Sequence, residues 1–246
     1  ARSRGLGDVY KRQINNSPRY EMARERATLC QSAKGPVALM NHFARELQTT
    51  GYLHNHARMW FAGWWIHVER LPWQLGAHFF FKNLLDADPA SNTLSWRWVA
   101  GLQTPGKTYL PRRSNIEKYM SPDLLDTLQE GLEILERPTA VHPEAVERER
   151  ITHPGPDPET LPDNRNAGIW VHEEDLLPEA SPLSPLKPKA VLVSGNSEAW
   201  EKFDFGGPKR KWLMAALEDV RLRAENHFRV SPEIVTQTHQ LQSITK

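Results

Sequence analysis

Residues 50–59 read TGYLHNHARM, residues 71–73 read LPW, residues 84–92 read LLDADPASN and residues 95–101 read SWRWVAG. Six of the nine tryptophans lie between Trp60 and Trp98, so their enrichment is local rather than spread over the chain. These four segments are embedded in a region whose apolar residues are regularly spaced. That spacing predicts the fold of the first half of the chain.

Apolar residues recur three and four positions apart in three successive stretches, which is the spacing of one face of an α-helix. The three sets are Met40, Phe43, Ala44 and Leu47; Ala57, Trp60, Phe61, Trp64 and Val68; and Trp73, Ala77, Phe80, Phe81 and Leu84. Gly51 stands where a C-terminal cap is expected, and Pro72 and Pro89 close the second and third stretches. The region from Pro36 to about Arg137 is therefore predicted to be helical.

A fourth helix is predicted to begin with Ser121 as its N-cap and Pro122 as its first residue. We expect it to bury Leu124, Leu128 and Leu135. It completes a partial helical domain over residues 14–137.

The second half of the chain has a different composition. Ten of the nineteen prolines lie between Pro138 and Pro188, and residues 138–189 are interpreted as a Pro-rich linker with one strand-like piece at residues 168–171. The run at residues 190–193 predicts a buried strand, Pro208 opens a helix, and residues 234–235 predict another strand. The apolar stripe of that helix is Leu213, Leu217, Val220, Ala224 and Phe228. Residues 190–246 therefore indicate the start of an α/β domain.

Composition limits the possible classes of protein. The 246 residues carry 31 basic and 30 acidic side chains, so the formal charge of +1 gives no global sign of nucleic-acid binding. The longest aromatic apolar run, residues 60–66, is too short to cross a bilayer, which needs about 20 residues. A single cysteine, Cys30, excludes a disulfide framework and predicts a cytoplasmic protein. Residues 1–13 lack periodicity and are interpreted as a non-native lead to a fragment.

Two features have more than one interpretation from the residues alone. Asp86 and Asp88 precede Pro89, and the simpler interpretation is that they only end a helix. Alternatively, these acids and Asn92 supply hydrogen-bonding groups to a ligand. A nearby cation would then offset the repulsion between two carboxylates, and Arg58 is the candidate. The basic residues around Tyr109 are either a solvated surface or a patch for a DNA backbone; they are Lys107, Arg112, Arg113 and Lys118.

In order, spacing and residue types, residues 50–119 resemble the FAD-binding core of the DNA photolyase and cryptochrome family. The resemblance implies a mainly α fold: a photolyase-like FAD-binding helical region, followed here by the Pro-rich linker and the α/β segment. It implies that Asp86, Ala87 and Asp88 lie beside the flavin ring. It further implies that Arg58 pairs with Asp86 and that Asn92 faces the flavin N5.

The tryptophans form a second group of candidate site residues. If residues 95–101 are helical, Trp96 and Trp98 lie about 200° apart and face opposite sides. By resemblance, Trp96 is the first electron donor to photoexcited flavin and Trp73 is the middle step of the relay. Trp98 would line the pocket that receives the flipped dimer. For Trp60, Trp64 and Trp65 we expect core packing.

The third group is on the substrate side. Asn55 and Met59 stand four residues apart, on one helical face. The resemblance assigns both to the lesion and favours the cyclobutane dimer, because enzymes for the pyrimidine–pyrimidone photoproduct carry histidine at both positions. It also assigns Tyr52 to the substrate side. His56 replaces a common arginine and is expected to meet a DNA phosphate.

The resemblance thus implies a photo-lyase: a monomer that uses FAD and blue light to repair pyrimidine dimers in damaged DNA, without a metal ion or membrane contact. The alternatives are a cryptochrome-like photoreceptor without repair activity and an inert helical piece that binds no flavin. The chain departs from the family in two respects. The upstream phosphate and adenine contacts have no match before Pro36, and the α/β segment follows the helices instead of preceding them. An antenna chromophore is not identified.

Overall fold

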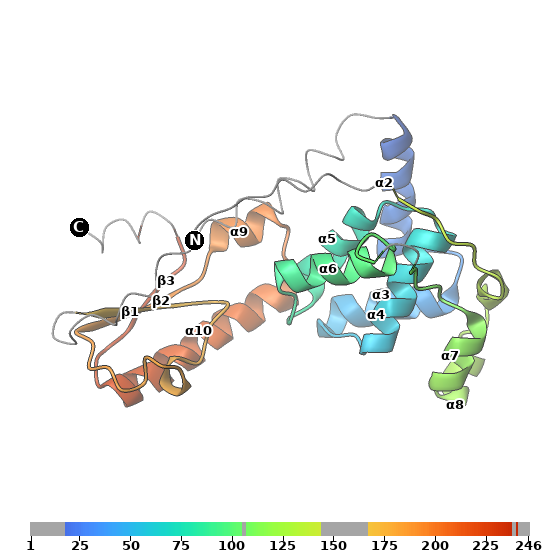
Figure 1. The fold of residues 1–246 in the computed structure, drawn as a ribbon. Coiled ribbons are helices and arrows are strands. Elements are labelled where there is room, and N and C mark those ends of the chain that lie inside the picture. The colour runs from blue at the N-terminus through green and yellow to red at the C-terminus, as the bar shows by residue number, and fades with distance from the viewer. Residues whose placement is uncertain (1–17, 105–106, 144–166, 238–239, 241–246) are drawn as a thin grey trace. The chain divides into compact units, whose positions relative to one another are not determined.

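The structure is a computed structural model that describes residues 18–104, 107–143, 167–237 and 240. The chain forms two compact units, residues 1–146 and residues 147–246, each described here by itself. Figure 1 shows the helices of the first unit and the small sheet of the second. The predicted fold class, a mainly α region followed by an α/β segment, is confirmed. The predicted lead, and residues 144–166 of the predicted linker, lie outside the described residues.

The described residues of the first unit form helices joined by loops, without a strand. Its elements are α2 (Pro18–Gln31), α3 (Ala38–Thr50), α4 (Asn55–Gly63), the π-helical turn η1 (Trp64–Val68), α5 (Trp73–Asn83), α6 (Pro89–Val99), α7 (Arg113–Tyr119), α8 (Pro122–Asp126) and the 3-10 helix η2 (Leu132–Leu135). The three stretches with helical periodicity are confirmed as α3, α4 with η1, and α5. Gly51 caps α3 with a φ of 70°, and its N–H donates to the carbonyl of Leu47. The sequence does not predict α2, because its apolar residues do not form a continuous stripe.

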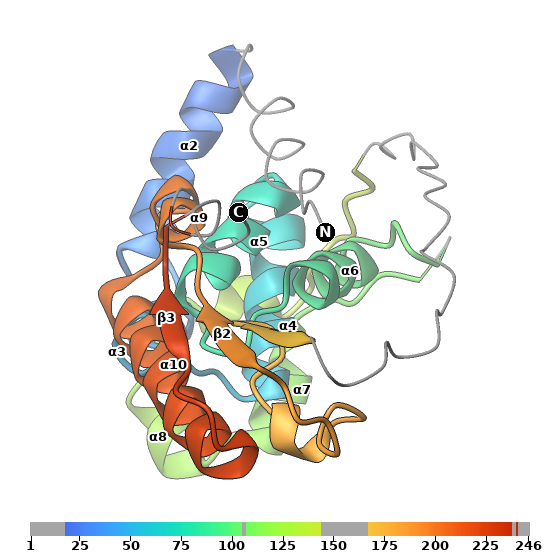
Figure 2. The same ribbon diagram turned by 90° about the vertical axis from the view of Figure 1, so that its left-hand side faces the viewer.

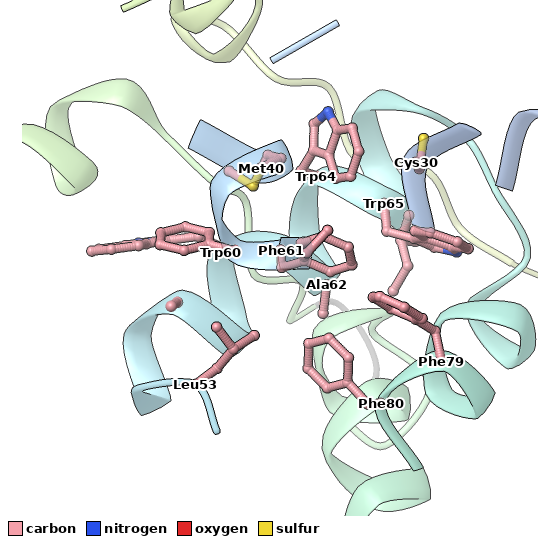
Figure 3. Close-up of a cluster of buried hydrophobic side chains, with 14 of the residues drawn as sticks. Cys30, Met40, Leu53, Trp60, Phe61, Ala62, Trp64, Trp65, Phe79 and Phe80 are labelled. Carbon is pink, nitrogen blue, oxygen red and sulfur yellow. The ribbon is translucent and has the colours of Figure 1, made fainter. Parts of the chain in front are cut away.

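The core of the first unit is aromatic (Figure 3). Trp64 and Trp65 are fully buried, Trp60 is nearly so, and Phe61 lies with its ring centroid 5.5 Å from that of Phe80 in α5. The expected packing role of these tryptophans is confirmed. The change from α4 to a π-helical turn rotates the inward face of the chain. Four successive residues, 64–67, can therefore all be buried.

The fourth predicted helix is much shorter than its leucine pattern indicates. Its start is confirmed, but α8 ends after five residues, and Leu124, expected to be buried, is 37% exposed. The chain then turns at Gly131, where φ is 81° and a Cβ would lie only 2.1 Å from the carbonyl oxygen of Pro36. Helix η2 follows, and its last residue is buried as predicted. A close approach between two backbone segments thus overrides the local periodicity.

The second unit contains a parallel sheet in the order β1 (Gly168–His172), β2 (Ala190–Ser194) and β3 (Glu233–Val235). Figure 2 shows β2 and β3 beside the long helix α10 (Gly207–Phe228). The strand-like piece predicted at residues 168–171 is confirmed as β1. It lies inside the range interpreted as a linker but belongs to the sheet, because Gly168 pairs with Ala190 of β2.

The connections of this sheet follow the predicted β–α–β order. Helices η3 (Pro178–Ala180) and α9 (Ser197–Lys202) are short, and α10 runs between β2 and β3. The predicted stripe of α10 is confirmed, since Leu213, Leu217, Val220, Ala224 and Phe228 are all buried. Within the described part of the chain, no helix combines the length and apolar character needed to cross a bilayer.

Candidate functional site

A cavity of about 510 Å³ lies in the first unit between α4, α5, α6 and the loop that joins α5 to α6. It brings together residues from three of the four segments on which the sequence analysis rests. The predicted site residues that line it are Asn55, Arg58, Met59, Asp86, Ala87, Asp88, Asn92, Trp96 and Trp98. Three others, Tyr52, His56 and Trp73, do not line it. Segments that are remote from one another in the sequence therefore share one concave surface.

The loop between α5 and α6 is held in place by backbone contacts. The N–H of Leu85 donates to the carbonyl of Gly51 at 2.9 Å. A Cβ on Gly51 would lie 2.6 Å from Cγ of Leu85, so the glycine permits this close approach as well as the positive φ. The loop that carries Asp86 and Asp88 is thereby fixed against the end of α3.

Arg58 and Asp86, which both line the cavity, form an ion pair. Nη2 of Arg58 lies 2.9 Å from Oδ2 of Asp86, and Nε of Arg58 donates to the carbonyl of Leu53 at 2.8 Å. The predicted pairing is observed. The side chain of Asp86 is 58% exposed, so solvent screens the pair and its contribution to stability is small. Its importance lies in fixing the direction of the carboxylate.

Asp88 and Asn92 both hold α6 in position. Oδ1 of Asp88 accepts from the N–H of Ser91 at 2.7 Å, which makes Asp88 the N-cap of α6, with Pro89 in the first turn. Nδ2 of Asn92 donates to the carbonyl of Ala77 in α5 at 2.8 Å. The simpler interpretation, that Asp88 only ends a helix, is therefore wrong: α5 ends at Asn83, whereas Asp88 begins α6 and its carboxylate also lines the cavity. Its assignment to a flavin stays a prediction.

The two tryptophans of α6 face different surroundings. Trp96 is 2% exposed and Trp98 is 40% exposed, as expected for residues on opposite sides of a helix. The ring of Trp96 meets Phe80 edge-on with centroids 5.0 Å apart and Trp65 with centroids 6.3 Å apart. Trp98 lies at the rim, 5.9 Å from the ring of Tyr109. One indole is thus rigidly packed and the other is accessible.

The C-terminal end of α6 is anchored by a buried histidine. Nε2 of His67 lies 3.0 Å from the carbonyl oxygen of Val99, and Nδ1 accepts from the N–H of Val141 at 3.1 Å. These partners require a neutral ring with its proton on Nε2. Burial lowers the pKa of His67, which favours this form. His67 therefore links η1, α6 and the segment that follows η2.

Asn55 and Met59 share one face of α4, as predicted, and both line the cavity. Nδ2 of Asn55 lies 3.8 Å from the sulfur of Met59. This contact pairs an amide that can donate and accept hydrogen bonds with an adaptable apolar side chain. The pair can present both kinds of contact to a planar ligand.

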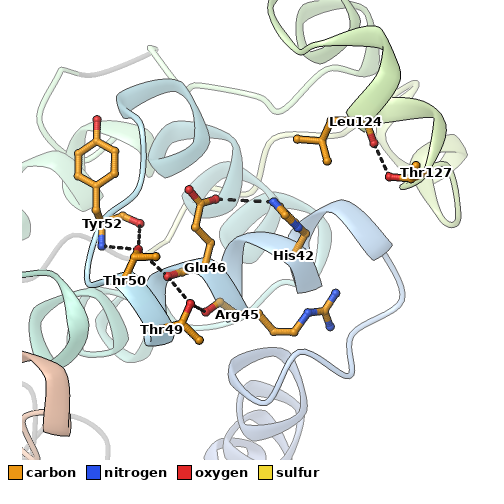
Figure 4. A network of polar contacts seen from close by, with 8 residues as sticks. All are labelled: His42, Arg45, Glu46, Thr49, Thr50, Tyr52, Leu124 and Thr127. Carbon is orange, nitrogen blue, oxygen red and sulfur yellow. Dashed lines mark hydrogen bonds and ion pairs between the residues drawn. The ribbon is translucent and has the colours of Figure 1, made fainter.

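Tyr52 and His56 lie outside the cavity. The N–H of Tyr52 donates to the hydroxyl of Thr50, which itself donates to the carbonyl of Glu46, so the chain before α4 is fixed to the end of α3 (Figure 4). Tyr52 is 54% exposed. His56 stacks on Tyr119 with ring centroids 4.9 Å apart. Their expected DNA contacts stay predictions.

Eight further residues line the cavity without having been singled out from the sequence. They are Ala62, Phe80, Leu84, Ser91, Leu94, Ser95, Val99 and Gln103. Phe80 and Leu84 belong to the apolar stripe of α5, which indicates burial but not a cavity wall. Ser91 and Ser95 stand four residues apart. Had the sequence analysis started a helix at Asp88, this spacing would have put both serines on one helical face.

Comparison with known proteins shows that the same helical region is similar to a known family. A family model described as the FAD-binding domain of DNA photolyase matches residues 12–122. A cryptochrome DASH of Idiomarina loihiensis is 31% identical over 102 residues, which is 42% of this chain and 22% of that protein.

Two further relatives match shorter regions. A deoxyribodipyrimidine photo-lyase of Streptomyces griseus is 39% identical over 66 residues, 27% of this chain and 14% of that protein. Cryptochrome-1 of Arabidopsis thaliana is 40% identical over 57 residues, 23% of this chain and 8% of that protein. The chain therefore spans less than a quarter of the length of each of these relatives.

Proposed function

We propose that this chain serves light-driven repair of cyclobutane pyrimidine dimers in DNA. Its helical unit belongs to the DNA photolyase and cryptochrome family, and its cofactor is FAD. The observation that carries the proposal is the gathering of nine candidate residues around one cavity. They include candidates for both cofactor and lesion. We further propose that the full-length protein acts as a monomer in the cytoplasm.

The residues around the cavity fit a flavin. An isoalloxazine ring has apolar faces and a polar edge, so it requires apolar walls and hydrogen-bonding groups on one side. Phe80 and Val99 give apolar walls, while Asp86 and Asp88 give acceptors. The indole N–H of Trp96 is buried and has no hydrogen-bond partner among the described residues. A ligand acceptor would relieve a cost of about 1–3 kcal/mol for such a group.

We assign the polar edge of the flavin to Asp86, Asp88 and Asn92, with Arg58 balancing the charge of Asp86. The bound flavin supplies light-driven one-electron chemistry. The protein contributes a rigid frame, since Asp88 caps α6 and Asn92 ties it to α5. A frame that does not need to reorganise keeps the binding groups aligned.

We assign electron transfer to Trp96, with Trp73 behind it. An indole is a large side chain that oxidises readily, and Trp96 combines a place on the cavity wall with a buried ring. Trp73 begins α5 and is 6% exposed. Burial of both rings in an aromatic core supports a protected route from the cavity.

We assign the lesion to Asn55, Met59 and Trp98, and backbone contacts to Tyr52 and His56. Extruding a base from a duplex costs a few kcal/mol, least for a damaged base. The exposed Trp98 at the cavity rim supports this assignment, because an accessible indole can stack on an extruded base.

A second candidate function is a flavin photoreceptor without repair activity. The relatives named above include a cryptochrome DASH and Cryptochrome-1, and this observation favours it. If the protein repairs DNA, substitutions at Asn55 and Met59 should reduce its action on a DNA substrate. A photoreceptor predicts that the same changes leave its flavin photochemistry and its signalling unaltered.

The experiment illuminates the reduced full-length protein with oligonucleotides that carry either a cyclobutane dimer or a pyrimidine–pyrimidone lesion. We expect restoration of the dimer only, and a larger loss of repair than of FAD content in Asn55→Ala. Asn226→Ala, an exposed position on α10, is the matched control. Repair of only the other lesion would contradict the substrate assignment. Repair of neither, with normal flavin absorption, would favour the photoreceptor.

A further inference from the structure

A column of stacked aromatic rings runs through α3, α4 and α7. The rings of Phe43 and Trp60 have centroids 6.3 Å apart with planes 23° from parallel. Trp60 and His56 follow at 5.6 Å and 19°, and His56 and Tyr119 at 4.9 Å and 13°. Four rings with nearly parallel planes therefore follow one another.

The column leads from the core to the surface. Phe43 and Trp60 are 3% and 2% exposed, whereas Tyr119 at the other end is 51% exposed. The indole N–H of Trp60 donates to Oδ1 of Asn115 at 2.8 Å, which ties the column to α7. The exposed ring of Tyr119 is therefore supported by buried rings that are held in place. Core packing alone does not require Tyr119 to be so accessible.

The column adjoins the rim of the cavity. Asn55 and Met59 line the cavity, and the next residue after each, His56 and Trp60, belongs to the column, so the two surfaces occupy neighbouring faces of α4. A second connection is through Tyr109. Its hydroxyl donates to the same Oδ1 of Asn115 at 3.2 Å, and its ring lies 5.9 Å from Trp98 at the rim.

Positive charge accompanies the exposed end of the column. The ammonium of Lys118 lies 5.0 Å from the centroid of the Tyr119 ring, and both side chains are exposed. A lysine has a flexible stem, so Lys118 can leave the ring for a phosphate when a base covers it. An exposed ring beside a flexible cation suits a nucleotide, whose base stacks while its phosphate is neutralised.

We propose that Tyr119, supported by His56, is a stacking platform for an unpaired nucleobase that flanks the lesion held in the cavity. The proposal rests on the proposed function, because it assumes a DNA strand whose damaged bases enter the cavity. It assigns to His56 a supporting role beneath Tyr119 in addition to any phosphate contact. Lys118 then neutralises the phosphate of the stacked nucleotide.

The test measures binding of the full-length protein to short single-stranded oligonucleotides with a central dimer. The base beside the dimer is either present or replaced by an abasic site, on the 5′ or the 3′ side. Tyr119→Leu removes the aromatic face but retains bulk, and Tyr119→Phe retains the face. Trp170→Ala, at a 57% exposed indole of the second unit, is the matched control for losing an exposed aromatic ring.

We expect Tyr119→Leu to weaken binding by about 10-fold when the flanking base is present. The effect should vanish with the abasic site on one side, and Tyr119→Phe and Trp170→Ala should bind like the unaltered protein. Unchanged far-UV circular dichroism and FAD content establish that the variants fold. Unaltered affinity in Tyr119→Leu, or an equal loss with and without the base, would overturn the proposal.

Undamaged oligonucleotides separate this proposal from the proposed function. If a dimer binds no better than adjacent thymines, the repair proposal fails, while a base-dependent effect of Tyr119 still supports the platform. If the dimer is preferred and the flanking base has no effect, the platform alone is refuted.

Discussion

Replacing Gly76 with alanine tests whether packing between α5 and Trp96 determines the wall of the cavity. A Cβ at position 76 would lie 2.2 Å from Cη2 and 2.4 Å from Cζ3 of Trp96. The indole has little room to move, because Phe80 and Trp65 meet it edge-on. Overpacking of this kind costs about 1–3 kcal/mol. Alanine favours an interior helical position over glycine by about 1 kcal/mol, so the free energy of unfolding should fall by up to about 2 kcal/mol.

Urea denaturation followed by far-UV circular dichroism measures this change. Gly207→Ala is the matched control, because a Cβ at the start of α10 would meet no atom within 4 Å. Combining Gly76→Ala with Trp96→Phe removes the clashing part of the indole, so the cost of alanine should shrink in that background. A Gly76→Ala variant that is more stable than the unaltered protein, or an equal effect of alanine in both backgrounds, would refute the reasoning.

Three further predictions concern the cavity and its supports. Asp88→Ala should weaken FAD binding by about 1–3 kcal/mol, measured by titration with FAD. Through loss of the cap of α6 it should also lower the free energy of unfolding by about 1 kcal/mol, measured by denaturation, whereas Asp88→Asn should retain the cap. Trp96→Phe should abolish photoreduction of oxidised FAD, read by absorption under blue light, and leave repair by pre-reduced FAD largely intact; photoreduction at the unaltered rate would move the relay elsewhere. The pKa of His67 is lowered in the folded state. The stability that its neutral ring contributes should therefore be fully present above about pH 6.5 and should decline as the pH falls through the lowered pKa. Denaturation at a series of pH values measures this decline, which His67→Gln should lack.

Elements with local signals were predictable from the sequence. The stripe of α10, the cap at Gly51 and the boundaries of α5 depend on residues close together in the chain. The features that the sequence did not predict depend on remote partners. The strand at β1 was predicted but its pairing with β2 was not, and the end of α8 is followed by a turn at Gly131, which approaches the backbone of Pro36. Periodicity within one segment contains no information about such contacts.

The candidate site shows the same division. Three of the four segments supply nine predicted residues that line one cavity, whereas Tyr52, His56 and Trp73 lie outside it, and the ion pair of Arg58 and Asp86 is in place. The segments did not predict the column that ends at Tyr119, because its rings come from three helices that meet only in the folded unit. The resemblance implied a phosphate contact for His56, which stays a prediction. The stacking of His56 between Trp60 and Tyr119 is evident only in the folded unit.

The position of Asp88 shows why a residue at a helix end and a ligand-binding residue need not be alternatives. An N-cap must expose its side chain at the first turn, where an oxygen can accept from a free N–H. In α6 that turn opens onto the cavity, so the constraint that starts the helix also fixes a carboxylate on the cavity wall. Asparagine satisfies the cap as well as aspartate does but lacks the negative charge. The Asp88→Asn variant therefore separates the two roles: normal stability with weakened FAD binding would assign the charge to the ligand, and normal values of both would leave Asp88 with its cap alone.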